Sequence, residues 1–440
     1  MTDPAPPAID PRYAESWKLL ERAERVIPLG SQTFSKSRTN YPEGAAPLFL
    51  ERGEGCRVWD VDGNEYVDMV GGLLPVVLGY CDPDVDEAIR RQLSRGITFS
   101  LATRLEVELA ERLVEIIPCA EKVRFGKNGT DATSAAVRLS RAFTGRERIA
   151  IGGYHGWQDW YIGATVRNKG VPEAVAALTH RFAFNDLAAL ERTLDAHPGE
   201  FAAVILEPLN AVVPDADYLA GMRDLAHRHG ALLVFDEIIT GFRAALGGAQ
   251  SLYGVVPDLA CFGKSMANGM PISTIVGRAE VMNEMENVFV SGTFGGETLS
   301  LAAAIATIDK MRTHHVIDAL EAKGAYLNAK VRAAVADAGL EGIVSLNGVP
   351  AWTLVGLADA PGARKEAIKT LFIKEMLREG VLMTGSHNIS YAHDEADLDT
   401  VAAAWRTVLG RIREALDAGD LEARLPCPAI QPVFSVRATA

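Results

Sequence analysis

Two short apolar runs, each leading to a charged residue, constrain the fold of this chain most strongly. Leu232–Phe235 runs directly into Asp236, and the run that ends at Phe262 is followed by Gly263 and Lys264. Apolar runs of this length are too short for helices and are typical of strands buried on both faces of a parallel sheet. The carboxyl ends of such strands lie at the edge where ligands of α/β proteins bind. We therefore expect Asp236 and Lys264, 28 positions apart, to meet at that edge.

An acid and an amine at one edge suit a cofactor that carries a cationic ring and is also bound covalently. The alternative is a nucleotide-binding phosphate loop, because Gly263-Lys264-Ser265 could end one. Such a loop requires a glycine five positions before Gly263. Asp258 stands at that position, so the phosphate loop is excluded. A lone lysine after a strand is usually a surface residue, and the motifs described next argue against that alternative here.

The segments Phe235–Ile238, Gly241–Arg243 and Gly263–Ile272 together resemble the signature of class III aminotransferases, which use pyridoxal phosphate (PLP). In that family the residue that matches Lys264 forms a Schiff base with the cofactor aldehyde, and the residue that matches Asp236 pairs with the pyridine nitrogen. The chemistry requires both. An exchangeable imine needs an amine beside the ring, and the ring withdraws electrons only while its nitrogen stays protonated.

This resemblance implies an α/β protein of PLP-dependent transferase fold type I. We expect a mainly parallel sheet of the seven-stranded type in a large domain, and a smaller α+β domain from the N- and C-terminal segments. The expected bounds are 1–50 for the N-terminal segment with an active-site loop, 51–312 for the large PLP-binding domain and 313–440 for the C-terminal small domain. Further strands are predicted at Asp258–Phe262, Ser273–Val276 and Val288–Val290.

A second motif follows a predicted strand that ends at Phe125. A glycine-containing turn leads into a helix that we expect to begin near Thr130 and to stop at Gly145. The first turn of a helix offers unpaired N–H groups and the positive end of the helix dipole, which suit a phosphate. We therefore expect Gly129 and Thr130 to bind the cofactor phosphate. The alternative is an ordinary helix cap made by threonine or aspartate.

The resemblance assigns further residues to the cofactor. Tyr154, in a Tyr-His-Gly motif after a strand, would stack on the ring, because a flat ring needs a flat wall. Ile238 would form the opposite, apolar wall. Glu207 matches a Glu-Pro pair of the family, and Asn210 would reach the 3′ oxygen of the cofactor. We interpret His155 as a structural residue and not as an acid or base.

Other residues are candidates for substrate or subunit contacts. Thr293 lies in a loop that resembles the Gly-Thr loop of the family, whose threonine reaches the phosphate of the other subunit, and this implies a homodimer with shared active sites. Lys36 and Arg38 could bind a substrate carboxylate, although a solvated basic loop is an equal alternative. Glu297, which stands where many relatives have asparagine, would recognise a hydroxyl or amine. Trp157 would line the substrate side or belong to the core.

Charge and cysteine content narrow the class of partner. A net charge of −13 over 440 residues argues against nucleic acid or an anionic membrane. The five cysteines are scattered, without a metal-binding cluster or disulfide framework, so we expect no metal and the reduced thiols of a cytoplasmic protein. No run approaches the about 18 apolar residues that a membrane span requires. The expected partners are therefore small-molecule amines and carbonyl compounds.

Two reactions are open to such a site. A transaminase moves the amino group of an amino acid or amine to a separate aldehyde or ketone through pyridoxamine phosphate. An aminomutase of the glutamate-1-semialdehyde type isomerises one substrate, and the chain resembles that subgroup. Ser386–Tyr391 lacks the glutamate of the corresponding aminomutase segment, which favours the transaminase. A catalytically silent binding protein of the same fold is the third reading, and intact Asp236 and Lys264 argue against it.

Overall fold

The computed structural model describes residues 8–431, and they form two compact units. Unit 1 holds residues 8–73, 78–81 and 319–431, and unit 2 holds residues 74–77 and 82–318. Residues 51–73, which we expect in the large domain from the sequence, group with unit 1. Residues 1–7 and 432–440 of the expected terminal segments lie outside the described residues, and the domain bounds at 50 and 312 stay a prediction.

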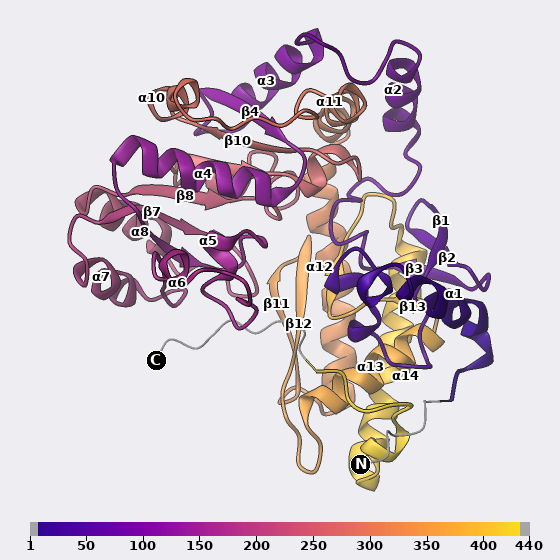
Figure 1. Ribbon diagram of the computed structural model, residues 1–440. Coiled ribbons are helices and arrows are strands. Elements are labelled where there is room, and N and C mark those ends of the chain that lie inside the picture. Colours follow the sequence, from indigo (N-terminus) through magenta and orange to yellow (C-terminus); the bar gives the residue numbers. More distant parts are fainter. Residues whose placement is uncertain (1–7, 432–440) are drawn as a thin grey trace. The chain divides into compact units, whose positions relative to one another are not determined.

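A seven-stranded sheet forms the centre of unit 2 in the described chain (Figure 1), with the strand order β4-β10-β9-β8-β7-β5-β6. Strands β9, β8, β7, β5 and β6 are parallel to one another, and β10 runs antiparallel to both β9 and β4. The mainly parallel sheet expected from the sequence is confirmed. Its strands are β4 (Lys122–Gly126), β5 (Arg148–Gly152), β6 (Thr179–Arg181), β7 (Phe201–Leu206), β8 (Leu232–Asp236), β9 (Leu259–Phe262) and β10 (Ser273–Gly277).

Strands β8 and β9 are neighbours in this sheet, and all of their residues are buried. Their register pairs Asp236 with Cys261, so the chain reaches Lys264 shortly beyond that pair. An apolar run with no polar face can form a strand only where both faces of the sheet are covered. The two apolar runs therefore bring an acid and an amine to one edge of the sheet.

Helices cover this sheet. Helix α4 (Gly129–Thr144) lies across β7, β8, β9 and β10 (Figure 1) and buries alanine and leucine side chains against them. It ends at Gly145, whose φ of 66° is the left-handed conformation that glycine adopts without steric cost. The other helices of this unit are α2 (Pro83–Leu93), α3 (Arg104–Ile116), α5 (Asp159–Ile162), α6 (Glu173–Ala176), α7 (Leu187–Asp195), α8 (Tyr218–Arg228), α9 (Ala249–Tyr253), α10 (Ala279–Met282) and α11 (Thr298–Thr313).

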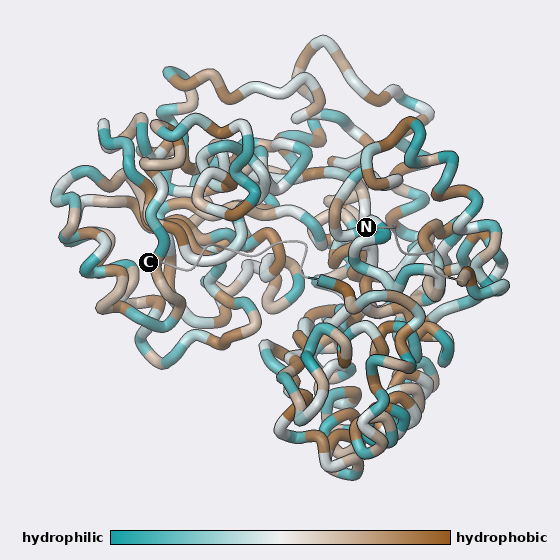
Figure 2. Tube along the Cα trace, turned by 60° about the horizontal axis from the view of Figure 1, so that its bottom comes forward, coloured by the Kyte–Doolittle hydropathy of each residue, from teal (hydrophilic) through white to brown (hydrophobic). Residues whose placement is uncertain are grey.

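Unit 1 combines helices with two small sheets, in the strand orders β1-β2-β3-β13 and β11-β12-β14. Hydrophilic and hydrophobic residues are interspersed along the whole described chain (Figure 2). Helix α12 (Val316–Asp337) begins in unit 2 and continues into unit 1. The other helices are α1 (Ala14–Glu24), α13 (Lys365–Arg378) and α14 (Glu395–Ala418). The strands are β1 (Leu50–Glu54), β2 (Arg57–Asp60), β3 (Glu65–Asp68), β11 (Val344–Val349), β12 (Trp352–Leu357), β13 (Val381–Leu382) and β14 (Ser386–Asn388).

The strand predicted at Val288–Val290 is wrong. This stretch pairs with no other strand, and the N–H of Val290 donates to the carbonyl of Val288 in a local turn, at 2.8 Å. The side chain of Phe289 between them is 81% exposed. A short apolar run becomes a strand only where a neighbouring strand accepts its backbone hydrogen bonds, and the described residues provide none here.

Three observations bear on the expected partners. Across residues 8–431, none of the helices is long and apolar enough to cross a membrane. All five cysteines are free. In the same residues, no three metal-ligating side chains come together as a metal site would require.

Candidate active site

Asp236 and Glu237 follow each other at the end of β8 but have different surroundings. Glu237 is fully buried, and its carboxylate accepts hydrogen bonds from the backbone N–H groups of Ala249 and Gln250, at 2.7 and 3.0 Å. It thereby caps the start of α9. The Oδ1 atom of Asp236 instead accepts from the N–H of Ile238, at 3.2 Å. Glu237 is committed to the fold, and Asp236 is the acid that remains for a site.

His155 holds the second carboxylate oxygen of Asp236. Its Nδ1 lies 2.7 Å from Asp236 Oδ2, and both side chains are buried. The Nε2 of His155 is also buried and has no hydrogen-bond partner among the described residues. When Asp236 is ionised it can only accept, so Nδ1 carries the proton of the pair. His155 therefore has a second role besides the structural one expected from the sequence, because it contacts the acid of the site itself.

Lys264 begins a short 3₁₀ turn, Lys264–Ala267, directly after β9 and Gly263. Its φ of 38° lies in the left-handed region that residues with side chains rarely adopt. Burial lowers the pKa of Lys264, and the cation of Arg243 acts in the same direction, while Asp236 and Glu207 oppose both. A lowered pKa increases the fraction of uncharged amine, which is the nucleophilic form.

Glu207 follows β7, the next strand along the sheet edge. Burial raises its pKa to about 7, and the neighbouring charge of Asp236 adds to the effect. Its Oε2 accepts a hydrogen bond from the N–H of Tyr154, at 3.0 Å. Asp236, Lys264, Glu207 and Tyr154 are therefore brought together by the ends of β8, β9, β7 and β5.

The N-terminus of α4 reaches the same region. A Cβ atom on Gly129 would lie 3.1 Å from Ile238 Cγ2, so glycine permits the close approach of this helix to Ile238. The Oγ1 atom of Thr130 is buried and has no hydrogen-bond partner among the described residues. Asp131 accepts from the N–H groups of Lys127 and Asn128, at 3.0 and 2.8 Å, so the capping expected as the alternative is present as well.

The aromatic residues near the Tyr-His-Gly motif divide into two groups. Tyr154 is 51% exposed and lies edge-on to Tyr161, and Trp157 is 66% exposed. Trp160 and Tyr161 belong to the hydrophobic core of unit 2. The exposed pair, Tyr154 and Trp157, is available to a ligand, whereas the buried pair supports the fold.

Three other candidates of unit 2 have contacts of their own. Asn210 Oδ1 accepts from the N–H of Val212, at 2.9 Å. Glu297 caps α11 through the N–H groups of its first turn and pairs with Lys127 Nζ, at 2.9 Å. Thr293 is exposed in the loop that follows Val290. The substrate role of Glu297 stays a prediction, and its bonds to α11 and Lys127 show a structural role that was not predicted.

Lys36 and Arg38 belong to unit 1, whereas the residues described above belong to unit 2. Arg38 Nε donates to Glu24 Oε1, at 2.7 Å, so its guanidinium has a carboxylate partner within its own unit. Both side chains are exposed or half-exposed, as a solvated basic loop would be. Their role in substrate binding stays a prediction.

Known proteins resemble this chain over most of its length. The family model of aminotransferase class-III matches residues 39–394, and the chain belongs to that family. A 3-aminobutyryl-CoA aminotransferase of Cloacimonas acidaminovorans is 35% identical and covers 92% of this chain and 99% of its own length. A glutamate-1-semialdehyde 2,1-aminomutase of Syntrophobacter fumaroxidans is 37% identical, covering 90% of this chain and 97% of its own.

Solved structures of PLP-dependent enzymes are also similar to this chain. The FumI protein of Sphingopyxis sp. MTA144, in its PLP internal aldimine form, superposes with a TM-score of 0.86 at 31% identity, covering 92% of this chain and 98% of that chain. A glutamate-1-semialdehyde aminomutase from Pseudomonas aeruginosa PAO1 gives 0.80 at 26% identity, covering 91% and 95%. The predicted fold, the enzyme class and the PLP cofactor are thereby confirmed.

The residues present fit that cofactor. The buried hydroxyl of Thr130 at the N-terminus of α4 has no hydrogen-bond partner within residues 8–431, and a phosphate oxygen would supply one. The buried Asp236 can accept from a protonated ring nitrogen, and Lys264 is a half-buried lysine whose pKa is lowered chiefly by its removal from solvent. The pair of His155 and Asp236 was missed from the sequence. The one available signal was that both residues follow strands of one sheet.

Proposed function

We propose that the chain is an aminotransferase in which Lys264 binds the PLP aldehyde and Asp236 pairs with the ring nitrogen. The observation that carries this proposal is the pairing of β8 with β9, which brings Asp236 and Lys264 to one edge of the sheet. Bound PLP supplies an aldehyde that exchanges amino groups with substrates and a ring that withdraws electrons. The chain's own residues bind that group, orient it and move protons.

Lys264 has two tasks in this proposal. Its uncharged amine bonds the aldehyde, and once released it accepts and returns a proton at Nζ. A neutral amine is required for both, and burial favours it. Asp236, held by His155 Nδ1, keeps a proton on the ring nitrogen because a buried carboxylate favours a cation beside it.

Other residues would fix the cofactor in place. Gly129 and Thr130 would bind its phosphate at the N-terminus of α4, and Tyr154 and Ile238 would enclose its ring. Glu207 and Asn210 would face the polar edge of the ring. These assignments are supported by the close packing of Gly129 on Ile238 and by the hydrogen bond from Tyr154 to Glu207.

A transfer between two substrates is favoured over an isomerisation. The segment Ser386–Tyr391 contains no acid, whereas the corresponding segment of the aminomutases carries a glutamate. Relatives of both kinds are similar to this chain, so the aminomutase of the glutamate-1-semialdehyde type is the second candidate. The donor would be an amino acid or amine, and the acceptor an aldehyde or ketone. Lys36, Arg38, Trp157 and Glu297 remain the candidates for substrate contacts.

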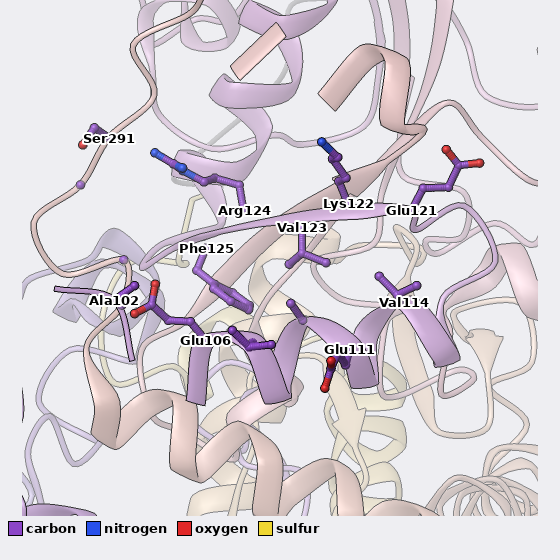
Figure 3. A pocket seen from close by; sticks show the side chains of 15 residues that line it. Ala102, Glu106, Glu111, Val114, Glu121, Lys122, Val123, Arg124, Phe125 and Ser291 are labelled. Atoms are coloured by element: carbon purple, nitrogen blue, oxygen red, sulfur yellow. The ribbon is translucent and has the colours of Figure 1, made fainter. Parts of the chain in front are cut away.

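We further infer a cytoplasmic homodimer with shared active sites. A groove of about 730 Å³ runs between α3 and β4, and Ser291 and Gly292 of the Thr293 loop line it. Val123 and Phe125 point from β4 towards α3, whereas Lys122 and Arg124 point to the other side of the strand (Figure 3).

The occupant of this groove would be a second copy of the chain. Val107 and Val114 of α3 are 56% and 42% exposed, and Phe294 in the adjoining loop is 57% exposed. Exposed apolar side chains that gather in one place mark interaction surfaces. Because Ser291 and Gly292 line the groove, a partner on this surface would place the Thr293 loop at the subunit interface, as the shared-site proposal requires. The free cysteines are consistent with a reducing compartment.

The proposed reaction is tested by adding single amines and amino acids to the purified holoenzyme. A transaminase converts the cofactor absorbance to that of the pyridoxamine form with a good donor alone, and a keto acid or aldehyde restores it. Conversion that never occurs without a second functional group on the same substrate would favour the aminomutase. An absorbance band that no amine changes would indicate a silent binding protein.

A further inference from the structure

Arg243 is a buried cation for which the proposed reaction has no use. Its side chain is 1% exposed, and its Nη2 donates to the backbone carbonyl of Leu74, at 2.9 Å. Burial lowers the pKa of Arg243 to about 9, so it remains a cation at neutral pH. Burying a charged side chain costs free energy unless hydrogen bonds or an opposite charge compensate for the lost water.

The carbonyl of Leu74 has a second donor. The hydroxyl of Ser265 donates to it as well, at 3.1 Å. Ser265 directly follows Lys264 in the chain, so one oxygen connects the Arg243 guanidinium to the turn that carries the lysine. Leu74 and Lys264 have φ values of 82° and 38°, in the left-handed region that L-residues rarely adopt. Such conformations persist only where the surroundings hold them.

The backbone that carries Arg243 is also fixed to the lysine strand. A Cβ atom on Gly241 would lie 2.2 Å from Cδ1 of Phe262, so this position has no room for a side chain. Phe242 lies edge-on to the same ring, with centroids 5.7 Å apart. Phe262 is the last residue of β9, two positions before Lys264. The turn with Arg243 and the turn with Lys264 therefore share one packed support.

We infer that Arg243 is a positioning residue for Lys264, acting through the Leu74 carbonyl that it shares with Ser265. This inference rests on the proposed role of Lys264. The hydrogen bonds hold the lysine turn in its left-handed conformation. The buried positive charge disfavours a second positive charge on the nearby amine.

The positive charge of Arg243 also acts on the pKa of Lys264. The cation of Arg243 is one of the causes that lower the pKa of Lys264, after burial, and it opposes the two carboxylates of the site. Without Arg243, the amine would be protonated at a higher pH. A protonated amine can neither bond an aldehyde nor accept a proton.

The test compares three variants of the full-length enzyme. Arg243→Met removes both the charge and the hydrogen bond, Arg243→Lys keeps the charge, and Ser265→Ala removes only the second donor. Arg141→Met is the matched control, because Arg141 is another arginine of unit 2 whose pKa is lowered by burial, near the far end of α4. First, borohydride reduction and peptide mapping of the wild-type holoenzyme must locate the cofactor on Lys264. If the cofactor is found elsewhere, the proposed function fails, independently of Arg243.

The main measurement is the pH midpoint at which Lys264 is acylated in the cofactor-free protein, read by mass spectrometry with the exposed Lys365 as internal reference. We expect Arg243→Met to raise this midpoint by about one pH unit, which slows acylation about tenfold at neutral pH. The kcat of its holoenzyme should fall about tenfold with little change in KM. Arg243→Lys should restore the midpoint, and Arg141→Met should leave midpoint and kcat at wild-type values.

Two outcomes overturn the inference. The first is an Arg243→Met midpoint equal to that of the wild type, with any loss of activity following a loss of thermal stability. The second is an equal shift in Arg141→Met. If Arg243→Met does not fold, the test depends on Ser265→Ala and Arg243→Lys. Both variants should keep the wild-type midpoint of Lys264 acylation but have a lower kcat. A normal kcat in both contradicts the inference.

Discussion

His155 Nδ1 lies 2.7 Å from Asp236 Oδ2, and the two buried side chains come from positions 81 residues apart in the chain. This contact fixes both the rotamer of the carboxylate and the tautomer of the ring, because an ionised Asp236 can only accept. The other oxygen of Asp236 accepts from the N–H of Ile238. Asp236 therefore meets a ligand with its orientation already set, and the cost of ordering it is not part of binding or catalysis.

His155→Phe should slow the enzyme while the cofactor stays bound. The ring that lies against Trp160 is kept, but the hydrogen bond to Asp236 is lost. A hydrogen bond to a charged group contributes about 1.5–3 kcal/mol, so we expect kcat to fall about tenfold to hundredfold. Thr133→Val is the control, because Thr133 Oγ1 donates only to backbone carbonyls, that of His155 at 2.9 Å among them. Wild-type kcat in His155→Phe would show that the contact is structural.

Asp236→Asn should have the larger effect. An amide can still form a hydrogen bond, so the cofactor should remain bound, as its absorbance would report. The amide carries no negative charge to keep the ring nitrogen protonated, and we expect kcat to fall by at least about a hundredfold. Single-turnover rates with an amino donor measure the proton transfer directly. Near-normal rates would mean that another acid serves the ring nitrogen.

The local signals of the sequence were sufficient for the fold and for part of the site. The apolar runs before Asp236 and Gly263 became β8 and β9, and the helix that stops at Gly145 became α4, because each signal acts within a few residues. Val288–Val290 carried the same kind of signal and formed no strand. Whether such a run finds a neighbouring strand depends on distant parts of the chain.

The contacts that orient the site were beyond local reasoning. The bonds from His155 to Asp236 and from Arg243 to Leu74 join residues 81 and 169 positions apart. Glu297 is a different case. A substrate contact was expected from its charge, and yet its position directly before Thr298 is also the position from which an acid caps a helix. The capping signal was present in the sequence and was outweighed by the resemblance.

Lys264→Ala should abolish turnover, by about a thousandfold or more, and leave the fold intact. Alanine removes the Nζ atom that bonds the aldehyde and moves the proton, while the packed residues around position 264 keep their contacts. Borohydride treatment should fix the cofactor to the wild-type protein and not to the variant, with Lys365→Ala as the control. A reducible cofactor adduct in Lys264→Ala would disprove the assignment of Lys264.

Glu207 should make the stability of the cofactor-free protein depend on pH. Its pKa is raised to about 7 in the folded state, chiefly by burial, whereas an unfolded chain ionises near the usual 4.5. Folding is therefore progressively disfavoured as the pH rises from about 4.5 through 7, because the folded protein must ionise a buried acid. Between pH 5.5 and 8.5 the Tm of the wild type should fall about 2–4 °C more than that of Glu207→Gln.

The control for this prediction is Glu173→Gln, on the exposed surface of α6. It should show the same pH dependence of Tm as the wild type, since the side chain of Glu173 is exposed to solvent. Glutamine at position 207 can still accept from the N–H of Tyr154, so the hydrogen bond is retained in the test variant. Equal slopes for the wild type and Glu207→Gln would contradict a raised pKa at Glu207.

Mixed dimers should distinguish a shared active site from a separate one. In the shared-site proposal, Thr293 of one subunit completes the phosphate site that Gly129, Thr130 and Lys264 belong to in the other. Lys264→Ala and Thr293→Phe should each be inactive alone. When they are mixed and their subunits exchange, one site of each mixed dimer carries both substitutions and the other site carries neither. Up to half of the sites in the mixed dimers should then recover activity.

The same experiment measures the linkage between assembly and cofactor binding. A ligand that binds only the dimer stabilises the dimer by mass action, so PLP should lower the concentration at which the wild-type enzyme dissociates. A bulky side chain at position 293 should weaken that effect. If exchange is demonstrated by differently tagged subunits and every mixture stays inactive, Thr293 acts within its own subunit. The exposed apolar side chains of α3 would then need another explanation than a shared active site.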